Sequence, residues 1–237
     1  MSPVNAHWSR LEVTIPVTYR FAATEATWPE SGRTRFKRDF ERIAHQSWSR
    51  RYVVAHDSTW DPQRVEVIVR IAELPNAPAA RLWHIWLLPF RIPGLATCVS
   101  YRYRGQVPEG LEPDGEVRWG EHVGDVALAQ MTAEDIDCRE TLDGFLQRGT
   151  DHEVGHMLGL QHPGCSRDDA PCYGRPHEPH RRRRIMGLGS RVTMGDYHWA
   201  LRIMQLHDPR RDWQLVSDRW FVQEGGRRVD RSRAICE

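Results

Sequence analysis

Eleven residues near the middle of the chain constrain its fold more than any other stretch. From His152 to His162 the sequence reads HEVGHMLGLQH, with histidines at the first, fifth and eleventh positions, a glutamate at the second and a glycine at the eighth. Residues four apart on an α-helix lie on one face, so the imidazoles of His152 and His156 can converge on one metal ion. Gly159 lets the backbone take a positive φ and leave the helix. The turn can then bring His162 back as a third ligand.

This spacing predicts a catalytic metal site. Three neutral imidazoles with a fourth position open to water are typical of catalytic zinc rather than of a closed structural site. Glu153 is rotated by about 100° from His152 around the helix, so it can reach the water rather than the metal. Zinc lowers the pKa of water from about 15.7 towards 7, and Glu153 can act as general base while the water attacks a carbonyl. We therefore predict a peptide-bond hydrolase with one zinc ion. Chance would produce the full pattern in about one chain of this length in several thousand.

The motif resembles that of the metzincin metallopeptidases. Leu160 and Pro163, which follows the third histidine directly, are most similar to the serralysin-type branch of that clan. The similarity is carried by residues 150–163 and extends in pattern to the helix expected to end near His207. It implies a zinc site whose three ligands and general base are His152, His156, His162 and Glu153.

The resemblance also implies two features beyond the histidines. Metzincins place a methionine under the metal in a tight turn, the Met-turn; Met186 in Ile185-Met186-Gly187 is the first candidate, and Met194 in Val192-Thr193-Met194-Gly195 is the alternative. Astacin-like and serralysin-like enzymes carry an oxyanion-stabilising tyrosine two residues after that methionine, but this sequence has Leu188 there. We predict Tyr197 as the possible donor, although a tyrosine that opens an amphipathic helix is more often a core residue. The alternatives are Tyr173 and His198.

The chain has 237 residues and a mass of 27.6 kDa, which suits one metallopeptidase domain over residues 1–237. We expect an upper subdomain of about residues 8–160 and a lower one of about 161–237. The resemblance implies an α+β, zincin-like fold. Its features are a twisted, mostly parallel sheet with an antiparallel edge strand, a metal-binding helix, and a C-terminal helix under the Met-turn.

Hydrophobic periodicity predicts the elements of the first half of the chain. Residues 11–21 alternate between apolar and polar side chains, which indicates a half-buried strand, and residues 65–71 give a second strand. An apolar stripe predicts a helix over about residues 34–50. The continuous apolar run 83–88 predicts a strand buried on both faces.

The second half is less regular. Residues 97–104 and 116–119 are candidate short strands, and by the resemblance one of them offers its backbone to an extended substrate. We expect the metal-binding helix to begin at Thr141 or Asp143. A further helical stripe runs from Tyr197 to the Asp208-Pro209 break, and the apolar tail after it suggests a final strand.

Charge excludes some functions. The formal net charge is +1, and Lys37 is the only lysine among 33 basic residues. A near-neutral chain creates no global field that would draw it to nucleic acid or membrane, and no apolar run approaches the roughly 20 residues that a membrane span needs. The run Arg181–Arg184 can recognise acidic groups of a substrate or nucleic acid, although a solvated basic face is the default interpretation.

The first residues show no signal-peptide pattern. We expect a secreted protease, or a bacterial toxin or effector that a secretion system delivers and an inhibitor or immunity protein controls, acting on a protein or peptide substrate. A cytoplasmic location is the alternative.

The cysteines and aspartates leave secondary possibilities open. Cys165 and Cys172 can form a local disulfide or stay free, and with His177 and His180 they can hold a structural zinc, which we favour less. Asp168 and Asp169 can bind calcium, but we favour the interpretation that they belong to a solvated loop. The state of all five cysteines is undetermined by the sequence: Cys98, Cys138, Cys165, Cys172 and Cys236.

Two function classes compete with the peptidase. A non-catalytic, zinc-containing binding module has no need of Glu153, and an arginine-rich nucleic-acid-binding protein conflicts with the near-neutral charge. Substrate, cleavage-site preference and oligomeric state stay open.

Overall fold

The computed structural model divides into two compact units. The histidine unit comprises residues 14–47 and 69–191, and the terminal unit comprises residues 1–13, 48–68 and 192–237. The subdomain boundary predicted near residue 160 falls inside the histidine unit. The residues that the structure describes are 7–22, 28–58, 62–74, 82–89, 99–112, 116–136, 139–142, 145–163, 173–174, 177–217, 221–224 and 227–230.

Four strands in the order β5-β6-β4-β1 run through the histidine unit. β4 pairs in parallel with both β1 and β6, whereas β5 pairs antiparallel with β6. The short connection between β5 and β6 permits only a hairpin, because a parallel pair needs a crossover of a dozen or more residues. β5 lies at the end of this order. The bounds are β1 His7–Phe21, β4 Trp83–Leu88, β5 Val99–Leu111 and β6 Val117–Thr132.

β4 is buried along its whole length, as its continuous apolar sequence predicts. β6 is much longer than the short strand predicted over residues 116–119. The structure carries β6 on through a buried stretch, residues 126–131. β6 is thus paired on both sides. Of the two segments that were candidates for binding an extended substrate, 97–104 corresponds to β5, which is the edge strand, and 116–119 corresponds to β6.

The predicted first helix is confirmed as α1, Glu30–Trp48. Its apolar stripe recurs every three to four residues and is buried throughout. Phe40 is fully buried, stacks on Phe36 at 6.1 Å between ring centroids, and meets the ring of Tyr19 in β1 edge-on at 6.3 Å. These contacts attach α1 to the sheet.

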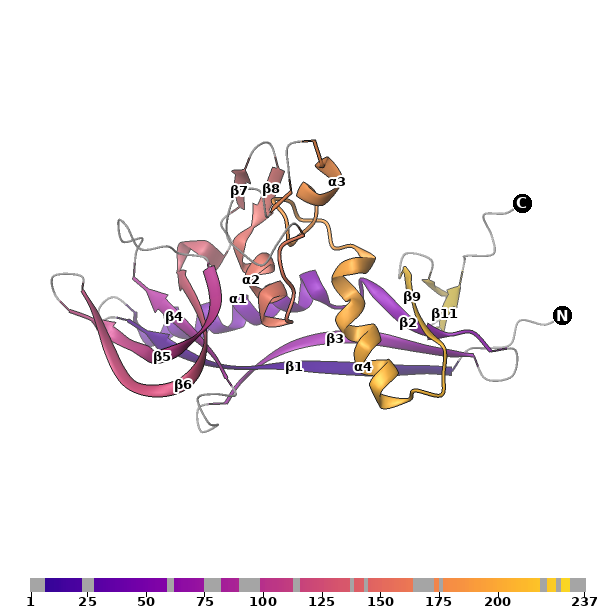
Figure 1. The fold of residues 1–237 in the computed structure, drawn as a ribbon, viewed down its shortest axis with the longest axis horizontal. Coiled ribbons are helices and arrows are strands. Elements are labelled where there is room, and N and C mark those ends of the chain that lie inside the picture. Colours follow the sequence, from indigo (N-terminus) through magenta and orange to yellow (C-terminus); the bar gives the residue numbers. More distant parts are fainter. Residues whose placement is uncertain are drawn as a thin grey trace. The chain divides into compact units, whose positions relative to one another are not determined.

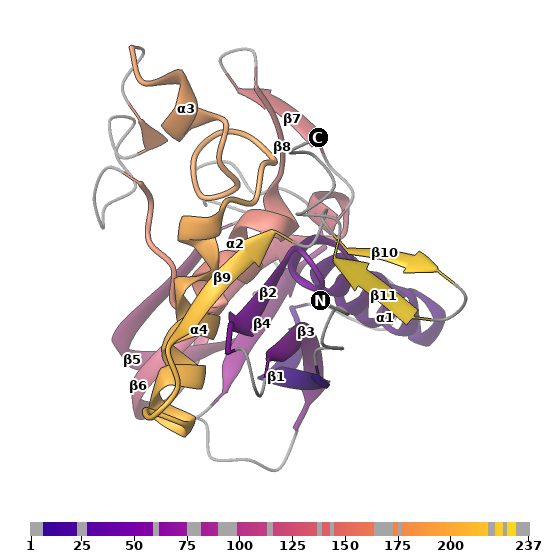
Figure 2. The same cartoon turned by 90° about the vertical axis from the view of Figure 1, so that its right-hand side faces the viewer.

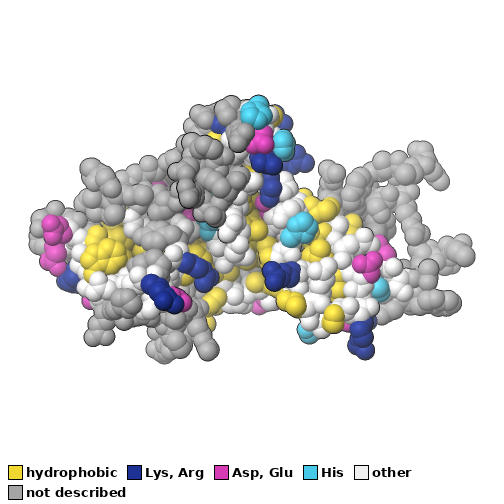
Figure 3. Space-filling view, viewed as in Figure 1, with side chains coloured by type: hydrophobic (Ala, Val, Ile, Leu, Met, Phe, Trp, Pro, Cys, Tyr) yellow, Lys and Arg dark blue, Asp and Glu magenta, His cyan; other side chains and the backbone are white. Residues whose placement is uncertain are grey.

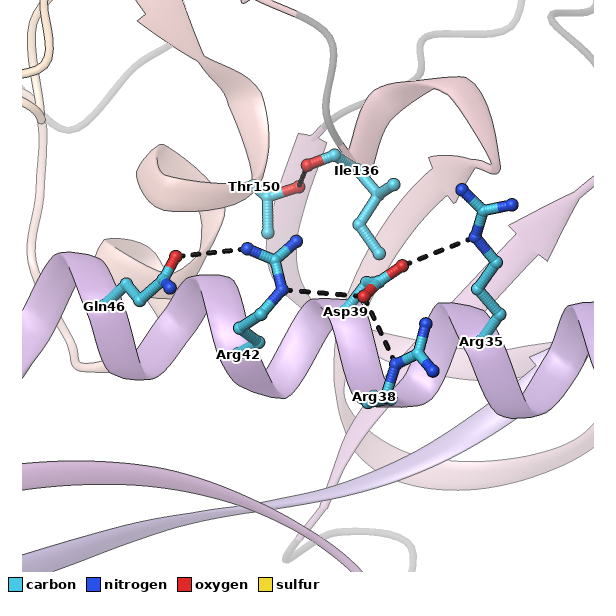
Figure 4. A network of polar contacts seen from close by, with 7 residues as sticks. All are labelled: Arg35, Arg38, Asp39, Arg42, Gln46, Ile136 and Thr150. Carbon is cyan, nitrogen blue, oxygen red and sulfur yellow. Dashed lines mark hydrogen bonds and ion pairs between the residues drawn. The ribbon is translucent and has the colours of Figure 1, made fainter.

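A network of ion pairs runs along α1 (Figure 4). Asp39 accepts ion pairs from three arginines at 3.5–3.6 Å, one turn before, next to and one turn after it, and Arg42 also donates to Gln46 at 3.1 Å. The arginine side chains are 44–76% exposed, so each pair contributes at most about 1 kcal/mol to stability. The arginines are Arg35, Arg38 and Arg42.

The prediction that the metal-binding helix begins at Thr141 or Asp143 is wrong. A two-stranded hairpin occupies this stretch, with β7 Arg139–Leu142 antiparallel to β8 Phe145–Arg148, and the helix α2 is Gly149–Met157. The 3₁₀ turn η2, Glu134–Ile136, precedes the hairpin. Within the histidine unit, α2 lies between α1 and the hairpin (Figure 1).

In the terminal unit, β2 pairs antiparallel with β3 on one side and β9 on the other (Figure 2). The family resemblance predicts a mostly parallel sheet. The strand pairs found are instead partly parallel and partly antiparallel, since β2 and β3, and likewise β5 and β6, form antiparallel hairpins. The helix predicted from Tyr197 to the Asp208-Pro209 break is present as α4, and the apolar tail after it forms three strands, β9, β10 and β11, rather than one. The bounds are β2 Tyr52–His56, β3 Gln63–Glu73, η4 Met194–Tyr197, α4 His198–His207, β9 Trp213–Ser217, β10 Phe221–Glu224 and β11 Arg227–Asp230.

Among the described residues, helices are too short or too polar to cross a membrane.

Candidate metal centre

Helix α2 is anchored at its first turn by side chains that reach neighbouring segments. The hydroxyl of Thr150 donates to the carbonyl of Ile136 in η2 at 3.2 Å (Figure 4) and to that of Asp135 at 3.1 Å. Ser47, near the end of α1, donates to the carboxylate of Asp151 at 2.6 Å. The carboxylate also suits this position because it lies at the positive end of the helix dipole. The start of α2 is thereby fixed to both α1 and η2.

The end of α2 has the hydrogen bonds of a Schellman motif. The N–H of Gly159 donates to the carbonyl of His156 at 2.9 Å, and the N–H of Leu160 donates to that of Gly155 at 3.0 Å. Gly159 has φ of 86°, which confirms the positive φ expected of it. The chain therefore reverses immediately after the helix.

This reversal brings the three predicted histidines together. The Nε2 atoms of His152 and His162 lie 3.0 Å apart, and the Nε2 atom of His156 lies 3.1 Å from each of them. They form the one cluster of possible metal-ligating side chains found among the described residues. Tetrahedral ligands bound at about 2.0–2.1 Å from zinc are about 3.3–3.4 Å apart, so the triangle has nearly the size that zinc requires.

The tautomers of two of these imidazoles follow from their other ring nitrogens. Nδ1 of His152 lies 2.8 Å from the carbonyl oxygen of Ile185, and Nδ1 of His156 lies 2.9 Å from that of Leu160. A carbonyl oxygen only accepts, so each Nδ1 carries the proton and each Nε2 presents a lone pair. Two lone pairs at 3.1 Å repel each other unless a cation lies between them. The donor set therefore fits a metal ion of the zinc type.

Burial keeps His152 neutral. Desolvation, followed by the neighbouring His156, lowers its pKa from 6.5 to about 3, against the opposing effect of the hydrogen bond to Ile185. A neutral imidazole is the form that binds a metal.

Glu153 follows His152 on α2 and is 3% exposed. It is therefore a buried carboxylate on the helix that carries two of the three histidines. The structure thus gathers all four predicted residues of the motif in one unit.

Met186 lies in a tight turn against the same helix. The N–H of Gly187 donates to the carbonyl of Arg184 at 2.9 Å, which closes the turn, and Met186 is fully buried. The preceding carbonyl, that of Ile185, is the acceptor for His152. Met194, the alternative candidate, is 45% exposed and belongs to the terminal unit. The positions favour Met186 for the turn beside the histidines.

Sequence patterns did not single out Gln147, which the structure brings to the same place. It is the second-last residue of β8, five residues before His152, and is 7% exposed. Its Nε2 lies 2.6 Å from the carbonyl oxygen of Gly187 and 3.2 Å from that of Ile185. A hydrophobic pattern in the sequence cannot identify this residue, because its hydrogen-bond acceptors lie 38 and 40 residues later in the chain.

The candidate oxyanion donors are placed differently. Tyr197 is fully buried, and its hydroxyl donates a hydrogen bond to the backbone carbonyl of Trp48. Its ring also packs against Tyr52 at 5.2 Å, so its position is that of a core residue of the terminal unit. Tyr173 instead lies against the histidines, with its ring centroid 4.2 Å from that of His162. His198 is exposed at the start of α4.

The arginine run forms part of the structure around the turn. Helix α3, Pro179–Arg182, supplies two arginines, and the ion pair of Arg181 with Glu178 is 3.3 Å long. Basic and histidine side chains gather on the surface at α3 (Figure 3). The carbonyl of Arg182 accepts from Leu188 at 2.8 Å, so the backbone of this run supports the turn that holds Met186. All five cysteines, Asp168 and Asp169 lie outside the described residues, so the disulfide, the second zinc and the calcium site stay predictions.

Substitution of Gly187 tests this packing. A methyl group at this position would overlap the carbonyl oxygen of Arg181, which is backbone and cannot rotate away. We expect Gly187→Ala to lower the free energy of unfolding by about 1–3 kcal/mol through overpacking, measured by thermal or urea denaturation. Gly32→Ala is the matched control, because the nearest atoms to its new methyl group are ordinary contacts at 3.7 Å. A loss no greater than that of the control would show that the turn is loosely packed.

Comparison of the chain with models of protein families, with curated proteins and with solved structures found no match. The function proposed below therefore rests on the motif and on the geometry of these residues.

Proposed function

We propose that the protein is a zinc-dependent endopeptidase of metzincin type. The observation that carries the proposal is the convergence of three Nε2 atoms at 3.0–3.1 Å, with two of the Nδ1 atoms donating to backbone carbonyls. Such an arrangement is unfavourable without a cation and fits zinc when one is bound. The residues that would hold it are His152, His156 and His162.

A zinc ion held by these histidines would supply a Lewis acid for the scissile carbonyl and would lower the pKa of a water molecule. Glu153 takes the proton from the attacking water and delivers it to the leaving amine. Burial at 3% exposure suits this role, because a carboxylate shielded from solvent exchanges its proton with the reacting groups rather than with bulk water. Ile185 and Leu160 accept from two of the ligands and keep their Nε2 atoms directed inward.

The edge strand β5 supports the endopeptidase part of the proposal. It ends the strand order of the histidine unit and lies next to α2. An unpaired strand edge can accept an extended peptide as an added strand. We propose that a substrate pairs with β5 and so lies in an extended conformation beside the histidines.

Metal content and cleavage test the proposal together. After dialysis against zinc and then against metal-free buffer, elemental analysis should find close to one zinc per chain. Cleavage of a mixed peptide library should stop on addition of a chelator and return with zinc. His156→Ala should lose both, because it removes one of three ligands.

His207→Ala is the matched control, since His207 is exposed on α4, and it should keep both zinc and cleavage. A wild-type protein that retains no zinc would contradict the proposal. Zinc without cleavage of any peptide would favour the non-catalytic binding module instead.

A further inference from the structure

Gln147 holds a central position among the groups around the candidate metal centre. Its side-chain amide has two N–H groups. Two backbone carbonyl oxygens and one imidazole nitrogen lie within hydrogen-bonding distance of Nε2. The carbonyl oxygens of Gly187 and Ile185 lie at 2.6 and 3.2 Å, and Nδ1 of His152 lies at 3.1 Å. The two carbonyls belong to the residues directly before and after Met186.

The distribution of protons among these groups has one consistent solution. Both carbonyl oxygens accept only, so the two amide N–H groups of Gln147 go to them. Nδ1 of His152 is then left to donate to Ile185, whose oxygen has a lone pair for each donor. If Nδ1 accepted from Gln147 instead, Nε2 would carry a proton and could not bind a metal. The amide thus favours the tautomer of His152 that a metal needs.

We infer that Gln147 is a positioning residue for the metal centre. Its amide bridges the carbonyls on both sides of Met186 and holds the turn against α2. Through the carbonyl of Ile185 it fixes the ring and tautomer of His152. Gln147 lies in the second half of β8, and α2, which carries His152, begins two residues after it. The amide therefore ties β8 to the Met186 turn just before the metal-binding helix begins. The inference rests on the proposed zinc site.

Gln147→Met separates this role from simple packing. Methionine has nearly the same length and keeps the space filled, but it removes the donor of the Gly187 carbonyl and one of the two donors of the Ile185 carbonyl. Groups that orient metal ligands typically change metal affinity by 10- to 100-fold. We expect the zinc dissociation constant, measured by competition with a chelating dye, to rise about 10- to 100-fold. The visible absorption of the cobalt-substituted protein should also change, since it reports the arrangement of the ligands.

A second variant and a control keep the test decisive. Gln147→Glu retains the polarity and shape but opposes two carbonyl oxygens with a carboxylate, so it should weaken zinc binding as well. Gln130→Met is the control, because Gln130 is the other buried glutamine of the described residues and lies in β6. It should keep the wild-type affinity and cobalt spectrum.

The outcomes distinguish the inference from the proposed function. Wild-type protein that binds no zinc would overturn the proposed function, and the inference with it. Wild-type protein that binds zinc, together with folded Gln147→Met or Gln147→Glu variants of unchanged affinity and spectrum, would overturn the inference alone. Folding is checked by circular dichroism, and failure of Gln147→Met to fold leaves Gln147→Glu to decide.

Discussion

Glu153→Gln is expected to bind zinc as the wild type does and to cleave peptides at least about 10²- to 10⁴-fold more slowly. The side chains have the same shape, so the buried site at 3% exposure can accommodate the amide. The amide cannot take a proton from water, and general acid–base groups contribute rate factors of this size. A factor of 10²–10⁴ corresponds to about 3–5.5 kcal/mol of activation free energy. Single-turnover cleavage of a peptide identified from the library measures it.

Zinc content must accompany every rate, because a variant that has lost its metal would also be inactive. Elemental analysis of Glu153→Gln should again give close to one zinc per chain, since Glu153 is not among the converging ligands. Glu134→Gln is the matched control: Glu134 is an exposed glutamate of the same unit, in η2. It should retain both zinc and rate. Undiminished cleavage by a zinc-loaded Glu153→Gln would remove Glu153 from the mechanism.

The histidine cluster could be predicted from the sequence because its geometry is local. A helix fixes the relation between His152 and His156, and one glycine with a positive φ sets the reversal that returns His162. The buried strand β4 and the stripe of α1 were predictable for a similar reason, since each has a continuous or periodic apolar pattern of its own.

The remaining features depend on partners far away in the sequence. Leu142, Phe145 and Leu146 are spaced as on a helix face, yet backbone pairing between β7 and β8 places this stretch in a hairpin. Gln147 resembles any polar residue before a helix until the turn around Met186, about 40 residues later, supplies its two acceptors. Tyr197 was predicted as an oxyanion donor from family resemblance, whereas its hydroxyl binds a backbone carbonyl 149 residues earlier.

Phe40→Ala is expected to lower the free energy of unfolding by about 3–5 kcal/mol, the usual effect of removing a fully buried phenylalanine. Native domains are stable by only about 5–15 kcal/mol, so this loss threatens the whole fold. It should also reach the metal centre, because the helix that Phe40 attaches to the sheet carries Ser47, which holds Asp151 at the start of α2. Urea denaturation of the metal-free protein measures the effect.

Arg38→Ala is the matched control for Phe40→Ala, since Arg38 lies on the outer face of the same helix with 69% of its side chain exposed. Surface substitutions of this kind usually change stability by less than about 0.5 kcal/mol. Saturating zinc should recover part of the loss in Phe40→Ala, because a ligand that binds only the folded state adds about 2.7 kcal/mol at 100 times its dissociation constant. If Phe40→Ala were as stable as Arg38→Ala, α1 would not be packed on the sheet. The support for the first turn of the metal-binding helix would then have to come from η2 alone.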